Sequence, residues 1–313
     1  MTIAIDCDDG KIWFGMKNAG SGHVWGDFGA SGVGDPANGT NPAFSGLDFD
    51  LYDFVPVVGV NAHSTSMVNF GQRSFSGTQP SGFNALCSSN MTQPTVDDPQ
   101  DEYCNVITYV GDGAADQDVT GVGFQPDLVW IKNRDAADGH QLYDSTRGAT
   151  NVLVIDSGIA ESTDADGLLS FDADGFSVGA GNEVNTNTEN YYAYCLQKQS
   201  GFFDIVSYTG TGNAHAESHS LGAVPKLIWV KNRDQADNHI LYHYASGNKT
   251  DPETDYLLPD AGNAVQDNAG AWNDTAPTST QFTVGTMHNT NANGEDYIAY
   301  LFNDVDGVCK IFH

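Results

Sequence analysis

The sequence contains the tetrapeptide Lys-Asn-Arg-Asp twice, in two stretches that are nearly identical over thirteen residues. The stretches are LVWIKNRDAADGH (128–140) and LIWVKNRDQADNH (227–239). A guanidinium can bind a carboxylate through two parallel hydrogen bonds, so the motif could bind an acidic glycan or a neighbouring subunit. The same charges could instead pair with nearby aspartates and fix the exit of a strand. Because the chain is so acidic, we favour the structural or subunit-contact role, for Lys132, Arg134, Lys231 and Arg233.

Short aspartate-rich stretches resemble parts of calcium-binding loops. They are DCDDG (6–10), DADG (164–167) and DADG (172–175). Hard cations prefer closely spaced carboxylate and carbonyl oxygens. None of the stretches completes the twelve-residue loop pattern: after Asp6, the terminal glutamate would fall at position 17, which is lysine. We therefore favour turns built on aspartate side chains. Calcium binding stays an open alternative, since the high charge favours bound cations. The residues concerned are Asp6, Asp8, Asp172 and Asp174.

Tryptophans could stack on the apolar faces of sugar rings. Trp130 and Trp229 lie in apolar runs and are expected in a core. Trp25 and Trp272 lie among glycine, asparagine and aspartate, so they are the better candidates for glycan contact.

No catalytic or metal motif stands out. The sequence has no GxSxG elbow, no HExxH and no phosphate-binding loop. Among 41 carboxylates, some pair will always match glycosidase spacing by chance, so that count supports no enzyme. The HxxxH pairs at 215–219 and 239–243 have no matching carboxylate or cysteine, and the five cysteines form no CxxC pair. We expect no catalytic residues, no disulfide framework and no zinc site.

The charge of the chain is extreme. Its 313 residues carry 41 acidic against 12 basic side chains, a net charge of −29. Such a field repels nucleic acid, which needs clustered Lys and Arg. It suits cation binding, solubility in salt or repulsion between crowded copies. The sequence has no apolar run long enough to span a membrane, and its N-terminus does not resemble a signal peptide, so we expect no membrane insertion.

The chain contains an internal duplication. YVGDG (109–113) aligns with YTGTG (208–212) at the same 99-residue offset as the opening pair. Later blocks align at an offset of 106, as FSVG (176–179) does with FTVG (282–285). The second copy has therefore gained seven residues, and the copies also differ where DSTRG (144–148) becomes HYASG (243–247). A specific function, such as binding through Arg147, is expected where the copies disagree.

These patterns predict an all-β chain of tandem β-sandwiches of the jelly-roll or concanavalin-A-like type. Short β-branched and aromatic runs with period two alternate with turn residues, and no segment shows a helical stripe. The run DLVWIKN is apolar on both faces, which predicts that both are covered. The expected domains are a partial sandwich at 1–96, a linker at 97–105, and repeats at 106–200 and 201–313. Each repeat could form a sandwich alone or a half sandwich completed by its partner.

Two regions resemble parts of bacteriophage virion proteins. IAIDCDDGKIWFG (3–15), with VNFGQRSF (68–75), resembles the second half of a SPRY-like, concanavalin-A-like sandwich. That sandwich normally has strands before this segment, so the first domain is expected to be reduced and completed by a neighbouring chain, or the chain is cut from a longer one. The region 106–198 resembles a repeat of phage tail-fibre-type proteins, and 202–303 matches it less well.

The resemblance implies a virion structural protein: a fibre, spike or decoration subunit on the particle exterior, assembled in the host cytoplasm. It implies contacts with other virion proteins, homotrimerisation, and weak multivalent attachment to host-surface glycans. The alternatives are a stand-alone carbohydrate-binding or adhesin module and a glycan depolymerase.

Overall fold

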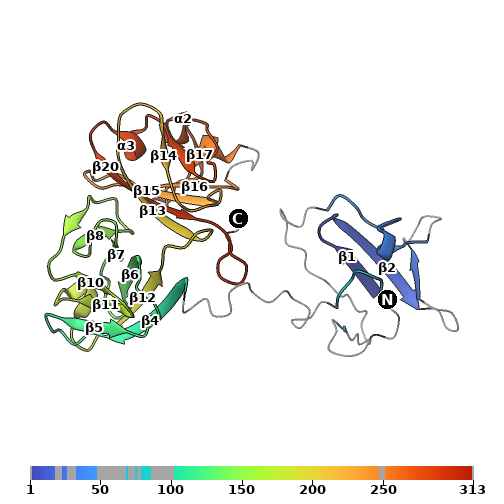
Figure 1. Cartoon of the computed structure of the whole chain (residues 1–313), viewed down its shortest axis with the longest axis horizontal. Coiled ribbons are helices and arrows are strands. Elements are labelled where there is room, and N and C mark those ends of the chain that lie inside the picture. Colours follow the sequence, from blue (N-terminus) through green and yellow to red (C-terminus); the bar gives the residue numbers. More distant parts are fainter. Residues whose placement is uncertain are drawn as a thin grey trace. The chain divides into compact units, whose positions relative to one another are not determined.

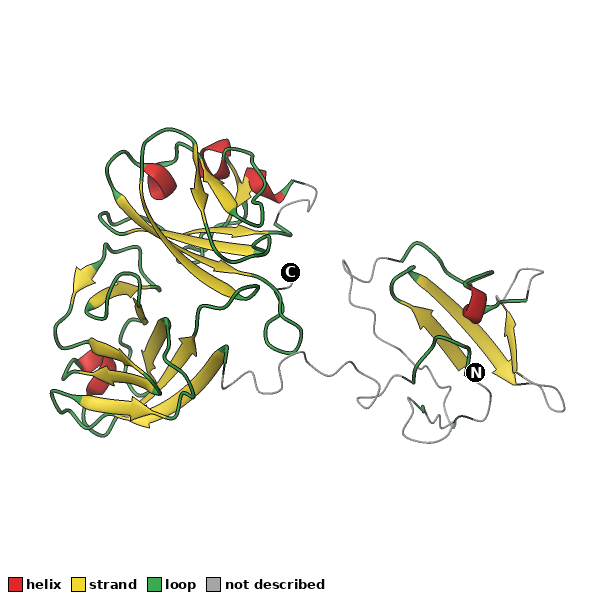
Figure 2. Ribbon diagram, viewed as in Figure 1, coloured by secondary structure: helices red, strands yellow, loops and turns green. Residues whose placement is uncertain are grey.

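The computed structural model describes residues 2–17, 23–26, 33–47, 68–69, 75, 79–85, 102–246 and 251–311. These residues form strands, turns and loops, and the prediction of an all-β sandwich fold is confirmed (Figure 2). The described α-helices are single turns of four residues, and no described helix could cross a membrane. They are α1 (Asn182–Asn185), α2 (Ala269–Trp272) and α3 (His288–Asn291).

The chain divides into two units, residues 1–93 and 94–313. The expected linker at 97–105 lies in the second unit, and its residues 97–101 are outside the described part of the chain.

The first unit contains an antiparallel sheet of β1 (Thr2–Asp6), β2 (Lys11–Lys17) and β3 (His23–Gly26), in that order. Trp13 of β2 is 1% exposed, and its indole Nε1 donates to the carbonyl oxygen of Thr40 at 2.9 Å. Gly10 occupies the left-handed turn between β1 and β2 with φ +61°. A Cβ at this position would lie 2.1 Å from the Leu47 carbonyl oxygen, so the turn requires glycine.

Repeat 1 is a sandwich of two antiparallel sheets. The larger has the order β4-β12-β6-β7-β8-β9 and the smaller β10-β11-β5. The core between them includes Val129, Ile131, Phe176 and Tyr191. The strands are β4 (Cys104–Val110), β5 (Gln117–Thr120), β6 (Leu128–Asn133), β7 (Gln141–Asp144), β8 (Asn151–Val154), β9 (Ser162–Thr163), β10 (Leu168–Asp172), β11 (Gly175–Val178) and β12 (Asn190–Leu196).

Repeat 2 has the same plan with its own core. Its larger sheet has the order β13-β20-β15-β16, which matches β4-β12-β6-β7 strand for strand. The core behind this sheet includes Ile228, Val230, Phe282 and Tyr297. The strands are β13 (Phe203–Thr209), β14 (His215–Ser218), β15 (Leu227–Asn232), β16 (Ile240–His243), β17 (Asp255–Tyr256), β18 (Gln266–Asp267), β19 (Gln281–Val284) and β20 (Asp296–Phe302).

The outer faces of the two larger sheets pack on each other (Figure 1). Side chains alternate along β6, so Val129 and Ile131 enter the core of repeat 1 while Leu128 and Trp130 enter a third cluster shared by both repeats. The prediction that both faces of this strand are covered is therefore correct. The core of repeat 1 covers one face of β6, and repeat 2 covers the other.

Candidate functional site

In both repeats, the asparagine of the Lys-Asn-Arg-Asp motif holds together the loops that follow β6 and β15. In repeat 1 the side-chain nitrogen of Asn133 donates to Asp138 at 2.7 Å and to Glu189 at 2.6 Å. Its side-chain oxygen accepts from the backbone nitrogen of Asp135 at 2.9 Å. The equivalent Asn232 donates to Asp237 at 3.0 Å and Glu295 at 2.6 Å.

The lysine and aspartate of the motif are also used internally. Lys132 Nζ donates to the carbonyl oxygens of Asn133 and Ala136, and Lys231 makes the same two bonds to Asn232 and Gln235. Burial lowers the pKa of Lys231 to about 8. The aspartates accept the backbone N–H at the start of a neighbouring strand: Asp135 from Asn190 and Asp234 from Asp296, each at 2.7 Å. These lysines and aspartates stabilise the turn.

The two arginines of the motif differ in their surroundings. Arg134 is exposed, and among the described residues its guanidinium has no ion-pair partner. Arg233 is half-buried and binds Glu161 of repeat 1 through both carboxylate oxygens, with Nε–Oε2 at 3.0 Å and the second nitrogen at 2.8 Å from Oε1. The expected subunit-type contact of Arg233 is thus made within the chain, between its two repeats.

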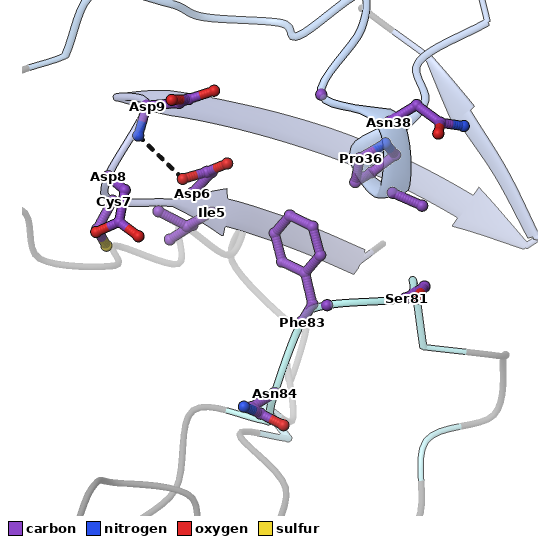
Figure 3. A pocket seen from close by; sticks show the side chains of 13 residues that line it. Ile5, Asp6, Cys7, Asp8, Asp9, Pro36, Asn38, Ser81, Phe83 and Asn84 are labelled. Carbon is purple, nitrogen blue, oxygen red and sulfur yellow. Dashed lines mark hydrogen bonds between the residues drawn. The ribbon is translucent and has the colours of Figure 1, made fainter.

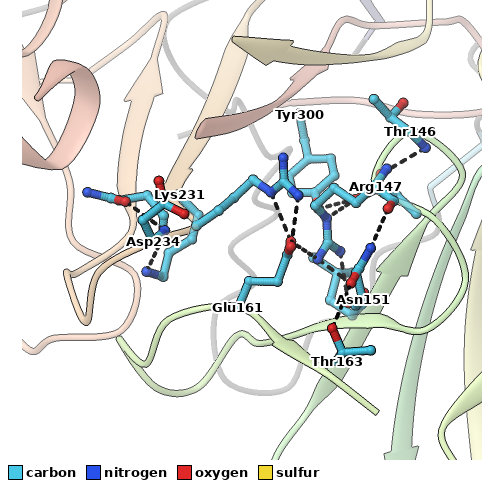
Figure 4. A network of polar contacts seen from close by, with 12 residues as sticks. Thr146, Arg147, Asn151, Glu161, Thr163, Lys231, Asp234 and Tyr300 are labelled. Atoms are coloured by element: carbon cyan, nitrogen blue, oxygen red, sulfur yellow. Dashed lines mark hydrogen bonds and ion pairs between the residues drawn. The ribbon is translucent and has the colours of Figure 1, made fainter. Parts of the chain in front are cut away.

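Arg147 lies at the centre of this inter-repeat contact (Figure 4). Its guanidinium is buried and contacts Asp144 Oδ2 at 2.5 Å and Glu161 Oε2 at 2.9 Å. The phenol of Tyr300, from repeat 2, donates to the same Asp144 oxygen at 2.7 Å. Arg147, predicted as a contact residue, is therefore not available to a glycan. It connects the two sandwiches through Asp144 and Glu161.

Glu161 and Arg147 both stay charged in this network. Burial alone would raise the pKa of Glu161, but hydrogen bonds from Arg233 and Arg147 outweigh it and hold that pKa below its usual range. Burial would lower the pKa of Arg147, but Tyr300 and Asp144 beside it raise it above its ordinary value. Burial also raises the pKa of Tyr300, so its hydroxyl remains a donor.

The two tryptophans predicted to contact glycan have different positions. Trp272 is 2% exposed in the core of repeat 2, and its Nε1 donates to the Asp255 carbonyl oxygen at 3.0 Å. Its prediction as a glycan contact is wrong, because the single turn α2 directs the indole inward against Tyr242. Trp25 lies on β3 and is half-buried.

The aspartates proposed for calcium fall in both units, Asp6 and Asp8 in the first and Asp172 and Asp174 in the second. Asp6 and Asp8 line a groove of about 520 Å³ in the first unit, and Asn38 and Phe83 also line it (Figure 3). Asp6 already accepts from the backbone nitrogen of Asp9 at 3.0 Å, as an aspartate turn does.

In repeat 1, Asp174 accepts from the backbone nitrogens of Gly121 and Gly123, at 3.2 and 2.7 Å. Asp172 accepts from Ser170 Oγ at 2.8 Å. Within the described ranges, none of the four aspartates joins a group of three metal-type ligands. The described contacts therefore support the turn interpretation.

A mixed cluster that the sequence reasoning missed lies in repeat 2. Ligand atoms of Asp237, His288 and Glu295 lie within 4.8 Å of one another. His288 Nδ1 is 2.8 Å from Asp237 Oδ2, and its Nε2 is 3.6 Å from Glu295 Oε1. Such a set could hold a divalent cation. The 106-residue offset places Asn182 at the position of His288 in repeat 1, so comparing the copies could have revealed this difference.

An aromatic surface on repeat 1 also escaped prediction. Tyr194 is 40% exposed, and its ring centroid lies 5.3 Å from that of Trp130 and 5.2 Å from that of Tyr192. Val106, paired with Tyr194 across β4 and β12, is 53% exposed. The period-two pattern of YYAYCL predicted a strand but not which face repeat 2 would leave uncovered.

Comparison with protein families assigns most of the chain. Residues 98–312 match the model of a domain of unknown function, DUF7483. The chain belongs to the DUF7483 family. The matched region spans both repeats, so the DUF7483 domain here is the pair of sandwiches together with the Arg147–Glu161–Arg233 contact between them. No curated protein and no solved structure matches the chain.

Proposed function

We propose that this chain is a structural subunit of a bacteriophage particle, a fibre, spike or decoration protein exposed on the exterior. The observation that carries the proposal is the use made of the duplicated polar motif. In both repeats its Asn, Lys and Asp side chains hold turns together, and in repeat 2 its Arg joins the sandwiches. A site for substrate turnover would instead present such groups in a cleft.

The resemblance to phage fibre repeats and to a SPRY-like module adds the virion context. The net charge of −29 suits a protein displayed in many copies, because like charge keeps crowded exteriors apart. Contacts with other virion proteins, a homotrimeric state and assembly in the host cytoplasm belong to the same proposal.

The test is to purify particles from the host that carries this sequence, quantify the chain by mass spectrometry, and locate it with labelled antibody. We expect a fixed copy number for each particle and label on the exterior. Absence from purified particles, with the chain present in the lysate, would overturn the proposal.

A second candidate is glycan attachment, as part of the virion role or as a stand-alone adhesin. The exposed Tyr194 beside Trp130 favours it, since aromatic rings stack on sugars. A glycan array should then give hits that Tyr194→Ser removes. Release of oligosaccharides from host polysaccharide would instead support the depolymerase alternative.

A further inference from the structure

The contact between the two repeats joins opposite ends of the outer faces of two equivalent sheets. Repeat 1 contributes Leu128, Leu142 and Leu153, on β6, β7 and β8. Repeat 2 contributes the opposite end of its sheet, β13 and β20. The residues of repeat 2 in this contact are Ile205, Ile298 and Tyr300. These three residues and the three leucines of repeat 1 are each at most 4% exposed. The contact is therefore head-to-tail, and each repeat has one more face of the type that its partner uses.

Repeat 2 carries its own copy of the leucine face. At the same sheet positions it has Leu227, Leu241 and Leu257, and Leu241 pairs with Leu257 as Leu142 pairs with Leu153. The three are half-buried, and in the described chain they belong to none of the three buried clusters. This set is called leucine face 2.

Repeat 1 carries its own copy of the receiving face. The 99- and 106-residue offsets map Ile205 onto Val106 and Tyr300 onto Tyr194. The exposed fraction rises from 4% for Ile205 to 53% for Val106, and from 1% for Tyr300 to 40% for Tyr194. Val106, Tyr192 and Tyr194 are called the aromatic face.

We propose that leucine face 2 of one molecule docks on the aromatic face of a second copy of this chain. The chain makes the equivalent contact internally. On one molecule the aromatic half of the next contact includes exposed residues, and the leucine half is half-buried. Because a head-to-tail interface is heterologous, it closes into a ring or extends into a filament. The inference rests on the proposed structural role, and it supplies the assembly surface for that role.

The contact between copies is apolar and weaker than the internal one. The internal network depends on Asp144 and Arg147, whose counterparts in repeat 2 are His243 and Ser246. Strand register places Val265 where repeat 1 has Glu161. The intermolecular contact therefore lacks these ion pairs, and salt that screens the net negative charge should strengthen it.

Sedimentation velocity of the full chain, over a wide concentration range in high salt, tests the inference. Wild type should form larger species as concentration rises. Val106→Asp removes the aromatic face and Leu241→Asp removes leucine face 2, so each variant alone should associate at least about tenfold more weakly. Val33→Asp adds the same charge at a 68% exposed valine of the first unit and should behave as wild type.

The decisive experiment is sedimentation of a mixture of the two interface variants. Val106→Asp retains leucine face 2 and Leu241→Asp retains the aromatic face, so the mixture should form one intact contact and stop at a heterodimer. A misfolded variant could not be rescued in this way. Monomeric wild type at every concentration, or variants that associate as wild type does, would overturn the inference.

Three further outcomes separate this inference from the glycan-attachment and virion proposals. If the chain stays monomeric and Val106→Asp abolishes glycan-array binding, the aromatic face is a sugar site and the inference is wrong. A chain that is monomeric yet present in purified particles contradicts only the self-docking. A chain that associates as described but is absent from particles contradicts only the virion role.

Discussion

Arg147 shows at the level of single residues how this chain uses its few positive charges. It is one of 12 basic residues against 41 acidic ones, and its side chain is fully buried between Asp144 and Glu161. A buried pair of this kind adds little compared with apolar packing, but removing one partner leaves an uncompensated charge. Arg147 should therefore be costly to lose.

We predict that Arg147→Ala lowers the free energy of unfolding by about 3–5 kcal/mol, because Asp144 would remain buried without its partner. Urea denaturation followed by fluorescence measures this. The control is Arg134→Ala at the exposed arginine of the duplicated motif, with an expected change below about 0.5 kcal/mol. Equal losses for both variants would contradict the assigned role.

Glu161→Gln should show, through the pH dependence of stability, that the charge of Glu161 stabilises the same network. The folded-state pKa of Glu161 is lowered, so its contribution is present above its unfolded pKa of about 4.3 and disappears as pH falls through the folded pKa. The variant should be about 1–3 kcal/mol less stable than wild type at neutral pH. Thermal melts should show the two converging below about pH 4. A difference that does not change with pH would exclude a charge effect.

Among the structural elements, the turn after β6 and its copy after β15 explain why lysine, asparagine and aspartate recur at the same positions in both repeats. Asn133 and Asn232 each bring two carboxylates to one amide nitrogen and accept a backbone N–H. An amide can do both because it carries a donor and an acceptor on one planar group. No charged residue of the same size could.

We therefore predict that Asn232→Asp destabilises repeat 2 by about 2 kcal/mol or more at neutral pH, since a third carboxylate would face Asp237 and Glu295. Like charges raise the pKa of the new carboxyl, so acidification should relieve much of the loss. Calorimetric melts across pH measure both effects. Asn187→Asp, at an exposed position, should leave the melts unchanged. Equal destabilisation at low and neutral pH would contradict this account.

At the scale of the whole molecule, we expect the apolar cluster shared by the two repeats to make them unfold as one cooperative unit. Leu153 lies in this cluster and is fully buried, whereas its counterpart Leu257 is half-buried. Equivalent leucines of the two repeats thus have different environments in one chain. Leu257 is therefore a matched control for Leu153.

In dilute protein, Leu153→Ala should lower the free energy of unfolding by about 2–5 kcal/mol, and Leu257→Ala should lower it by less than about 1.5 kcal/mol. Hydrogen exchange by mass spectrometry should show Leu153→Ala weakening protection in β13 and β20 of repeat 2 as well as in repeat 1. Effects confined to repeat 1 would mean that the two sandwiches unfold independently.

The sequence alone determined the secondary structure class and the register of the duplication. Period-two patterns and turn residues are local properties, and they correctly predicted the all-β fold and the two-sided burial of DLVWIKN. The offsets of 99 and 106 residues also aligned equivalent strands, because the copies kept the residues of one fold.

Only the tertiary structure decided which of two equivalent residues is paired, buried or exposed. Arg134 and Arg233 have the same neighbours in sequence, yet only Arg233 binds Glu161, 72 residues away. Trp272 has a loop-like sequence around it but lies in a core, and Tyr194 lies in an apolar run but is exposed. These outcomes depend on which face of one sheet meets the other. That contact joins residues distant in sequence, which no local pattern specifies.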